Sequence, residues 1–364
     1  MRAARLYGVG DLRVEEVPDP RPRAGEALVR IHASGVCPSD IRSYTGVRAT
    51  REPWTPGHEI AGVIVALGAD APESPADAPE SPASAAESPA SAAGDPGSAV
   101  GPWAVGDRVA VDWRGVCGVC RQCERGAANF CRNVVSYPIA GFADLTTMPL
   151  RQLRRLPDEV SFEAASFCEP LACVLNAHRA VPVGLGADVL VVGAGPIGLL
   201  HTQVAAGRGA RVIVLDRLAD RLDVARTCGA HDVVVAGDDG GAAEIRELTE
   251  GYGPDAVIVT VGIPSVIQTA LTMAGKNATV NLFAGTHPKG TIAVNPDIPH
   301  YDQVAINGSH DFTPHDFSTA LRLLRFGMVD TAPLVSHRFD LADITEAFET
   351  TRAQTGLKSI VVAG

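Results

Sequence analysis

Short apolar runs in the first part of the chain predict β-strands. In residues 27–33 apolar side chains alternate with Arg30 and His32, and residues 60–67 form a second, longer apolar run. Alternation with a period of two is typical of a strand with one buried face. Residues 105–111 add a Gly-Asp turn that leads into a third strand-like run. The pattern therefore predicts a mostly β region.

From residue 188 onward, predicted strands alternate with predicted helices. Apolar runs that predict strands lie at residues 189–192, 212–215, 232–235, 256–259 and 279–283. Between them, helical patterns cover residues 198–206 and 221–227. Near-continuous apolar strands separated by helices are typical of a parallel sheet that is covered on both faces. The last residues predict an amphipathic helix at 343–352 and a strand at 359–362.

Residues 70–100 have a different composition from the rest of the chain. They contain only Ala, Pro, Ser, Glu, Asp and Gly until Val100, and the unit Glu-Ser-Pro-Ala-Ser-Ala-Ala occurs at 80–86 and again at 87–93. A Pro in each unit and the lack of large apolar residues exclude a coiled coil. We expect a disordered insertion in a surface loop, since the segment has nothing to bury. A docking segment is the alternative.

The composition of the whole chain favours a globular protein with two domains. The chain has 364 residues, of which 46% are hydrophobic, enough for two cores. Its net charge of −11 disfavours nucleic acids and acidic membranes as partners. Neither a membrane-spanning apolar stretch nor an apolar secretory segment is evident. We therefore expect a cytoplasmic protein whose cysteines serve metals or catalysis.

A glycine-rich motif follows the first predicted strand of the parallel sheet. Gly193-Ala-Gly195-Pro-Ile197-Gly198 matches the dinucleotide fingerprint and lies between a buried strand and a helix, as that motif requires. The first Gly permits a tight turn, and the second lets the main chain approach a pyrophosphate at the helix N-terminus. Asp216 ends the next strand, where a carboxylate accepts ribose hydroxyls and repels the 2′-phosphate of NADP. NAD is therefore the predicted cofactor, and a glycine-rich turn without a ligand is the alternative.

Four of the eight cysteines lie close together in the sequence. They are Cys117, Cys120, Cys123 and Cys131. Thiolates at this spacing suit a closed, tetrahedral, structural zinc site. An iron–sulfur centre uses similar spacings and stays open as an alternative, whereas disulfides do not fit the expected reducing compartment.

Four further residues could bind a metal but are dispersed along the chain. Cys37 lies in Gly-Val-Cys-Pro-Ser-Asp, His58 and Glu59 lie in Pro-Gly-His-Glu, and Glu169 lies in Phe-Cys-Glu-Pro-Leu. Taken singly, each has an ordinary explanation as a buried thiol, a loop histidine or a surface acid. Because no spacing rule links them, the residues alone leave a second metal site open.

In their order along the chain, these segments resemble the zinc-containing medium-chain alcohol dehydrogenases. The resemblance covers nearly the whole chain outside residues 70–100 and is closest to the polyol branch, with its sorbitol, threonine and cyclitol dehydrogenases and enzymes similar to 2-deoxy-scyllo-inosamine dehydrogenase. It implies an α/β fold with a Rossmann doubly wound parallel sheet over residues 157–299. A mostly β, GroES-like catalytic domain would cover residues 1–156 and 300–364. The implied cofactors are NAD and two zinc ions per chain.

The resemblance also assigns roles to individual residues. The catalytic zinc ligands would be Cys37, His58 and Glu169. Glu59 would be the acid that binds the metal or stands behind it. Ser39 matches the hydroxyl residue that passes the alcohol proton outward. In addition to the glycine fingerprint and Asp216, the implied cofactor contacts are Arg221, Phe283 and Ala284. The implied substrate contacts are Tyr44, Asp311 and Phe312.

Three positions depart from the family pattern. Pro38 stands where Gly is usual, and Arg42 stands where a His often ends the proton relay, so the exit route of the proton stays open. Asp311-Phe312 replaces the Arg-Tyr pair that handles polyol hydroxyls in the sorbitol enzymes. The inverted charge at Asp311 fits the ammonium group of an aminated substrate. An intramolecular salt bridge, for example with Arg42, is the alternative.

The prediction is therefore an NAD-dependent zinc oxidoreductase that acts on a polar secondary alcohol: a polyol, a cyclitol or an amino-cyclitol. The alternatives are an enzyme similar to L-threonine 3-dehydrogenase or to a short-chain diol dehydrogenase, and a module that binds zinc and nucleotide without catalysis. A zinc-finger DNA-binding protein does not fit the acidic charge. The expected partners are a small alcohol or ketone substrate and identical subunits in a homodimer or homotetramer, with neither nucleic acid nor membrane.

Overall fold

The computed structural model describes residues 1–49, 53–68, 102–137, 139–286 and 288–363. The predicted insertion at residues 70–100 lies outside these ranges. Within them, the helices are all too short or too polar to cross a lipid bilayer.

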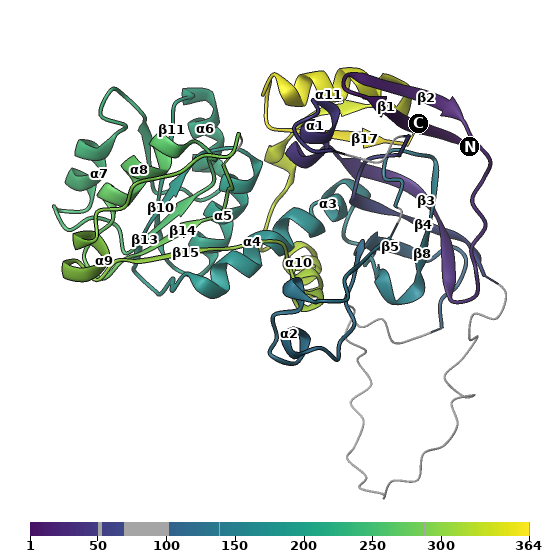
Figure 1. Ribbon diagram of the computed structural model, residues 1–364, viewed down its shortest axis with the longest axis horizontal. Helices are drawn as coiled ribbons and strands as arrows, with labels where there is room; N and C mark the ends of the chain where they lie inside the picture. The colour runs from purple at the N-terminus through teal and green to yellow at the C-terminus, as the bar shows by residue number, and fades with distance from the viewer. Residues whose placement is uncertain (50–52, 69–101, 138, 287, 364) are drawn as a thin grey trace, which may run out of the picture.

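A six-stranded parallel sheet forms one half of the molecule (Figure 1). The strand order β12-β11-β10-β13-β14-β15 is that of a doubly wound Rossmann sheet. The strands are β10 (Asp188–Val192), β11 (Arg211–Asp216), β12 (Asp232–Val235), β13 (Ala256–Val259), β14 (Thr279–Leu282) and β15 (Ala305–Gly308). The connecting helices are α5 (Pro196–Gly207), α6 (Ala219–Thr227), α7 (Ala242–Leu248), α8 (Pro264–Met273) and α9 (Asp297–Tyr301).

Alternate residues of the parallel strands fill two separate cores. Val189 and Val191 of β10 pack in the cluster that includes Leu199 of α5, whereas Leu190 packs in the cluster that includes Ile267 of α8. All three strand residues are fully buried. Because both faces are covered, these strands are continuous apolar runs in the sequence.

The other half is built on a seven-stranded sheet in the order β16-β17-β3-β4-β5-β9, with β8 paired to β3. Its strands are β3 (Glu26–Gly35), β4 (Glu59–Leu67), β5 (Arg108–Val111), β8 (Leu145–Pro149), β9 (Leu153–Arg155), β16 (Val335–Phe339) and β17 (Lys358–Val362). Two small hairpin-like sheets pair β1 (Arg2–Gly8) with β2 (Asp11–Glu16), and β6 (Arg114–Gly115) with β7 (Val135–Ser136). The helices of this half are α1 (Pro38–Tyr44), α2 (Arg121–Glu124), α3 (Phe162–Ser166) and α11 (Ile344–Arg352).

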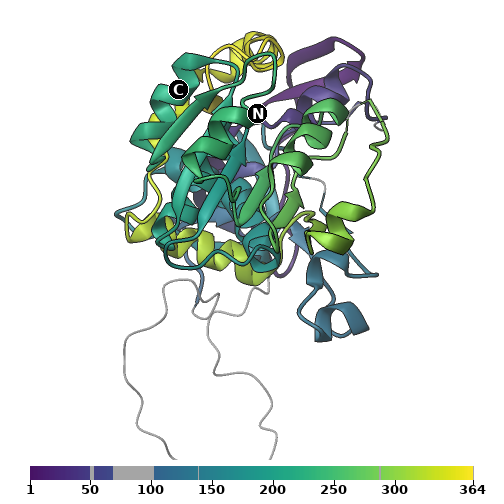
Figure 2. The same cartoon turned by 90° about the vertical axis from the view of Figure 1, so that its left-hand side faces the viewer.

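Two helices lie between the sheets. These are α4 (Cys168–Ala180) and α10 (Pro314–Arg325), which pack against each other (Figure 1). Figure 2 shows that the segment with α2 projects from the body as a small lobe. We call residues 114–136 the cysteine lobe.

The α/β architecture predicted from the sequence is confirmed, and the predicted strands at 189–192, 232–235 and 256–259 match β10, β12 and β13 closely. The domain limits stay a prediction. The parallel sheet itself extends past the expected limit at residue 299, because β15 (Ala305–Gly308) is its sixth strand.

Candidate active site

The four clustered cysteines of the cysteine lobe converge on one point. The Sγ–Sγ distances are 3.5 Å for Cys117–Cys131, 3.6 Å for Cys120–Cys123 and 4.0 Å for Cys120–Cys131. A tetrahedral zinc ion with Zn–S bonds of about 2.3 Å requires sulfur atoms about 3.8 Å apart. A disulfide would need sulfurs about 2 Å apart. The donor set and its spacing therefore fit one tetrahedral metal ion.

Main-chain amides support the negative charge that such a site requires. The N–H groups of Cys117 and Asn133 each donate to Cys131 Sγ at 3.3 Å. Backbone donors, with that of Cys123 first, lower the pKa of Cys120 to about 6. Since metal binding requires thiolates, these donors prepare the cluster for a cation.

The structure brings together the second, dispersed set of candidate ligands. One donor atom each of Cys37, His58 and Glu59 lies within 4.8 Å of the others, and Glu169 Oε1 lies 4.0 Å from His58 Nε2. The four residues come from three segments: Cys37 caps α1, His58 and Glu59 lie at the start of β4, and Glu169 lies in the first turn of α4. A thiol, an imidazole and a carboxylate are donors that zinc accepts, so the residues fit a catalytic zinc site.

Asp40 orients two of these ligands. Its Oδ2 atom accepts the N–H of Cys37 at 3.0 Å, and its Oδ1 atom lies 3.6 Å from His58 Nδ1. Burial disfavours a charge on His58, but the neighbouring Asp40 and Cys37 raise its pKa well above the ordinary value. A carboxylate on the distal ring nitrogen fixes which nitrogen faces the metal. Asp40 lies in the motif around Cys37, but no spacing or charge pattern in the sequence predicts this role.

Two further contacts were also missed from the sequence. Trp113 Nε1 donates to Glu169 Oε1 at 3.4 Å, and the Trp113 ring meets the His58 ring edge-on at a centroid distance of 5.9 Å. The buried ammonium of Lys358 pairs with the buried carboxylate of Glu59. Burial raises the pKa of Glu169 to about 7, and His58 acts in the opposite direction. Trp113 and Lys358 both lie far from the candidate ligands in the sequence, so no local motif predicts these contacts.

Ser39 lies beside two of the candidate metal ligands. Its Oγ atom is 3.5 Å from His58 Nε2, and its N–H donates to Cys37 Sγ at 3.5 Å. Arg42 lies one turn further along α1 and is partly exposed. The geometry places a hydroxyl beside the candidate metal ligands, and the onward proton route stays a prediction.

Each fingerprint glycine has a distinct reason for lacking a side chain. Gly193 has φ +103°, and a Cβ atom there would lie 2.5 Å from Thr260 Oγ1. A Cβ atom on Gly198 would lie 1.8 Å from the Gly193 carbonyl oxygen, so this position permits close packing of helix on strand. Gly195, by contrast, caps α5 and faces open space. That open main chain at a helix N-terminus fits a pyrophosphate.

The other predicted cofactor residues surround the ends of the parallel strands. Asp216 is the last residue of β11, and its carboxylate accepts the N–H groups of Ala194 and Leu218. Phe283 and Ala284 follow β14 and line a cavity of about 360 Å³. Ile197 lies in the first turn of α5 and is partly buried.

Arg221 has a contact that the sequence did not predict. Its guanidinium donates to the carbonyl oxygens of Gln354 at 2.8 Å and Gly356 at 2.9 Å, in the loop between α11 and β17. It therefore bridges the two halves of the molecule in addition to its expected place beside the cofactor.

The three predicted substrate residues have partners within the protein. The Tyr44 hydroxyl donates to Glu349 of α11 at 3.0 Å, and its ring packs edge-on against Phe348 in a buried core. Phe312 is 2% exposed and packs in the main core, near Phe317. Both side chains are therefore part of the packed core, and their predicted contact with a substrate stays a prediction.

Asp311 has a charged partner within the protein. Its carboxylate pairs with Arg114 of β6, and each of the two side chains is 12% exposed. The alternative of an intramolecular salt bridge therefore holds, with Arg114 as the partner in place of Arg42. A carboxylate that is already paired with a guanidinium attracts a substrate ammonium group less strongly.

Comparison with known proteins places this geometry in a family. The model of the alcohol dehydrogenase GroES-like domain matches residues 23–77 and 91–158, and that of the zinc-binding dehydrogenases matches residues 196–325. The chain belongs to the zinc-containing medium-chain alcohol dehydrogenases. As a member of this family, and of its polyol branch, it is an oxidoreductase that oxidises alcohols with a nicotinamide cofactor.

Individual relatives of this medium-chain dehydrogenase align along nearly their whole length. It is 29% identical to the sorbitol dehydrogenase of Halalkalibacterium halodurans, covering 98% of this chain and 96% of the relative. It is 29% identical to the L-threonine 3-dehydrogenase of Pyrococcus horikoshii, covering 93% and 91%. Among solved structures, an alcohol dehydrogenase from E. coli in complex with NADH is 25% identical, with a TM-score of 0.83 and coverage of 100% and 99%.

Proposed function

We propose that this dehydrogenase transfers hydride between NAD and a polar secondary alcohol of the polyol, cyclitol or amino-cyclitol class. The observation that carries the proposal is the convergence of Cys37, His58, Glu59 and Glu169 from three separate segments of the chain. A zinc-binding module without catalysis would need only the four cysteines of the lobe. The dispersed set therefore favours the enzyme over the module.

The chain's own residues divide the work at this site. Cys37, His58 and Glu169 would hold a zinc ion, with Glu59 behind it, kept in place by Lys358. Zinc bound there supplies Lewis-acid chemistry that lowers the pKa of a bound alcohol. Ser39, 3.5 Å from His58 Nε2, is placed to take the hydroxyl proton outward. A second zinc ion in the Cys117 cluster would be structural.

The relatives suggest the substrate class. Their names specify sorbitol, L-threonine and, for a relative from Mycolicibacterium smegmatis, erythritol or L-threitol. All are small molecules with a secondary alcohol next to another polar group. An enzyme similar to threonine dehydrogenase or to a diol dehydrogenase stays the alternative. The pairing of Asp311 with Arg114 weakens the specific case for an amino-cyclitol.

Self-association is part of the proposal. Strand β15 pairs only with β14 among the strands of the described residues, so its other edge is open for pairing. An open edge at the end of a parallel sheet is a site where a second copy can extend the sheet. We infer a homodimer or homotetramer.

A substrate panel tests the proposal. Purified protein is given NAD with sorbitol, threitol, a cyclitol, an amino-cyclitol, L-threonine or 2,3-butanediol, and NADH formation is followed. We expect turnover of at least one polyol or cyclitol, with kcat/KM above that for L-threonine. Turnover of threonine or of the diol alone would favour the alternative enzymes. Binding of NADH without turnover of any alcohol would favour the non-catalytic module.

A further inference from the structure

The loop of residues 309–313 joins the two halves of the molecule. It leaves β15, the last strand of the parallel sheet, and enters α10, which packs against α4. Ser309 and His310 line the same cavity as Phe283 and Ala284. The loop therefore connects the wall of this cavity to the helix that packs against α4, and α4 carries Glu169.

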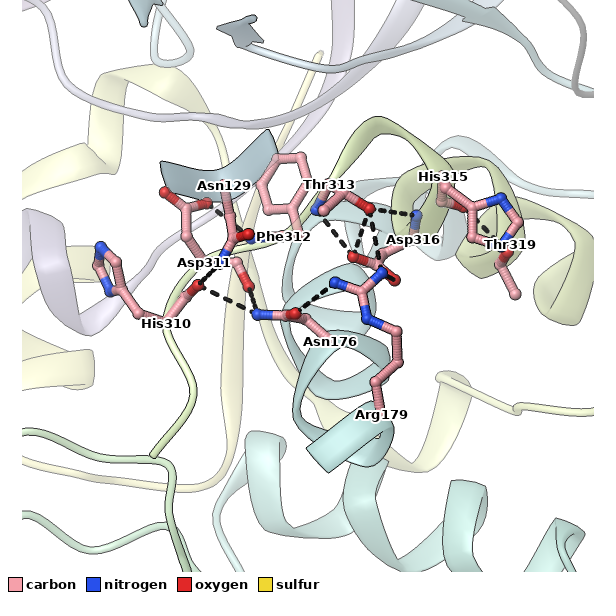
Figure 3. A network of polar contacts seen from close by, with 10 residues as sticks. All are labelled: Asn129, Asn176, Arg179, His310, Asp311, Phe312, Thr313, His315, Asp316 and Thr319. Carbon is pink, nitrogen blue, oxygen red and sulfur yellow. Dashed lines mark hydrogen bonds and ion pairs between the residues drawn. The ribbon is translucent and has the colours of Figure 1, made fainter. Parts of the chain in front are cut away.

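Side chains from two other segments hold the main chain of this loop (Figure 3). The Asn176 amide of α4 donates to the carbonyl oxygens of His310 at 3.1 Å and Asp311 at 2.8 Å. The Asn129 amide of the cysteine lobe donates to the same His310 oxygen at 2.9 Å. Asp311 has φ +60°, a left-handed backbone that is uncommon outside glycine, and its own carboxylate accepts the N–H of Phe312 at 3.0 Å.

The Arg114–Asp311 ion pair is the charged contact in this arrangement. Arg114 comes from β6 at the start of the cysteine lobe, and it also donates to the Asn129 carbonyl oxygen at 2.7 Å. One guanidinium thus contacts both the loop and the lobe residue that holds the loop. Both partners are largely buried, and separating a buried pair leaves a charge without compensation. The pair therefore opposes any movement of the loop away from the lobe.

The residues around Arg114 contact both candidate metal sites. Trp113, directly before it, donates to Glu169 and lies against His58. Cys117, three residues after it, belongs to the cysteine cluster. One short segment thus contacts a candidate catalytic carboxylate, the connecting loop and the structural cluster.

We propose that the Arg114–Asp311 pair is a positioning device, which fixes loop 309–313 and the cofactor-facing cavity relative to the candidate metal ligands. Arg114 and Asp311 act through the loop and do not bind substrate. This inference rests on the proposed NAD-dependent oxidation, because its readouts are cofactor affinity and turnover. It also gives Asp311 a role in place of the substrate contact expected from the sequence.

Steady-state kinetics of three variants test the device. Asp311→Asn keeps the shape of the side chain but removes its charge, and we expect KM for NAD to rise about tenfold or more, since bonds to charged groups are the stronger ones. The fall in kcat is expected to be smaller, and the zinc content unchanged. Arg114→Met should have the same effect. The double variant should be no worse than either single one, because the two residues act as a unit.

Asp107→Asn is the matched control. Asp107 pairs with Arg155 at 3.0 Å in the same half of the molecule. Its carboxylate also accepts the Ala104 N–H, and neither partner has a contact with Arg114 or loop 309–313 among the described residues. We expect this variant to lose stability but to keep the wild-type KM for NAD. Asp311→Glu keeps the charge, serves if Asp311→Asn does not fold, and should restore most of the affinity.

Two results would overturn the inference. One is an equal rise in KM for NAD in Asp311→Asn and Asp107→Asn, which would indicate a general loss of stability. The other is additive effects of the Arg114 and Asp311 substitutions. A direct titration of the wild type with NADH separates this inference from the proposed function, since a wild type that does not bind NADH contradicts the latter.

Discussion

At the scale of single residues, Asp216 is held by main-chain donors and keeps free acceptor capacity. Ala194 donates to Oδ2 at 2.7 Å and Leu218 donates to Oδ1 at 2.9 Å. Since a carboxylate oxygen can accept two hydrogen bonds, each oxygen retains a site for a ribose hydroxyl. The same fixed negative charge disfavours the additional phosphate of NADP.

Cofactor preference follows from this carboxylate. We predict a higher kcat/KM with NAD than with NADP, and a gap that Asp216→Gly narrows by about tenfold to a hundredfold, the range for a hydrogen bond to a charged group. Asp223→Asn, on the exposed side of α6, should leave the ratio unchanged. Equal kcat/KM with both cofactors in the wild type would contradict the assignment of Asp216.

Residue roles were predictable from the sequence only where a motif or the family resemblance carried them. The four lobe cysteines lie close together in the sequence, and Cys37, His58 and Glu169 each lie in a motif that the resemblance matches. The substrate roles of Tyr44, Asp311 and Phe312 stay predictions. Their partners in the structure, which are Glu349, Arg114 and the core around Phe317, could not be predicted because tertiary packing sets them. Sequence position alone does not show whether a side chain faces a cleft or a core.

At the scale of elements, α4 and α5 meet through two buried histidines. His201 Nδ1 lies 3.1 Å from His178 Nε2, and the two side chains are 0% and 2% exposed. Burial lowers the pKa of His178 to about 3 and that of His201 well below the ordinary value. Both imidazoles are therefore neutral in the folded protein, and their protonation at low pH would destabilise this packing.

Stability should accordingly depend on pH. In the unfolded chain these histidines bind protons below about pH 6.5, whereas His178 in the folded protein does so only near pH 3. The unfolded state thus binds more protons in this window, and the free energy of unfolding falls as the pH decreases from about 6.5 toward 3. Urea unfolding at pH 7 and pH 5.5 measures the loss.

Substitutions on α5 separate the imidazoles from packing in general. His201→Leu should reduce the difference in unfolding free energy between the two pH values. Leu199→Ala removes buried volume from the same helix and should lower stability by about 2–5 kcal/mol at both pH values. A pH dependence that His201→Leu leaves unchanged would show that other groups cause it.

The elements themselves were largely predictable because their periodicity is local. Buried parallel strands such as β10 and β13 have continuous apolar runs, and the half-exposed β3 has an alternating one. Helix α4 was not predicted: its residues are mostly buried, so it lacks a polar face that would reveal a helical period. Glu169, taken singly as a surface acid, is 8% exposed at the start of that helix.

At the scale of the whole molecule, function depends on contacts between the two halves. The loop 309–313, the α4–α10 pair and the Arg221 bridge to Gln354 and Gly356 fix the parallel sheet against the half that carries Cys37 and His58. Two domains could be expected from length and motif order. Their mutual placement could not, because the contacts that set it join residues far apart in the sequence.

The zinc content and turnover of Cys37→Ser, measured beside the wild type, test the central claim most directly. The wild type should contain two zinc ions per chain, one for each ligand cluster. Cys37→Ser should contain one, remain folded and lose NAD-linked alcohol oxidation. Cys120→Ser is the control and should instead lower the melting temperature, since a structural zinc ion contributes folding free energy. A Cys37→Ser variant that keeps both zinc ions and the wild-type rate would contradict the account.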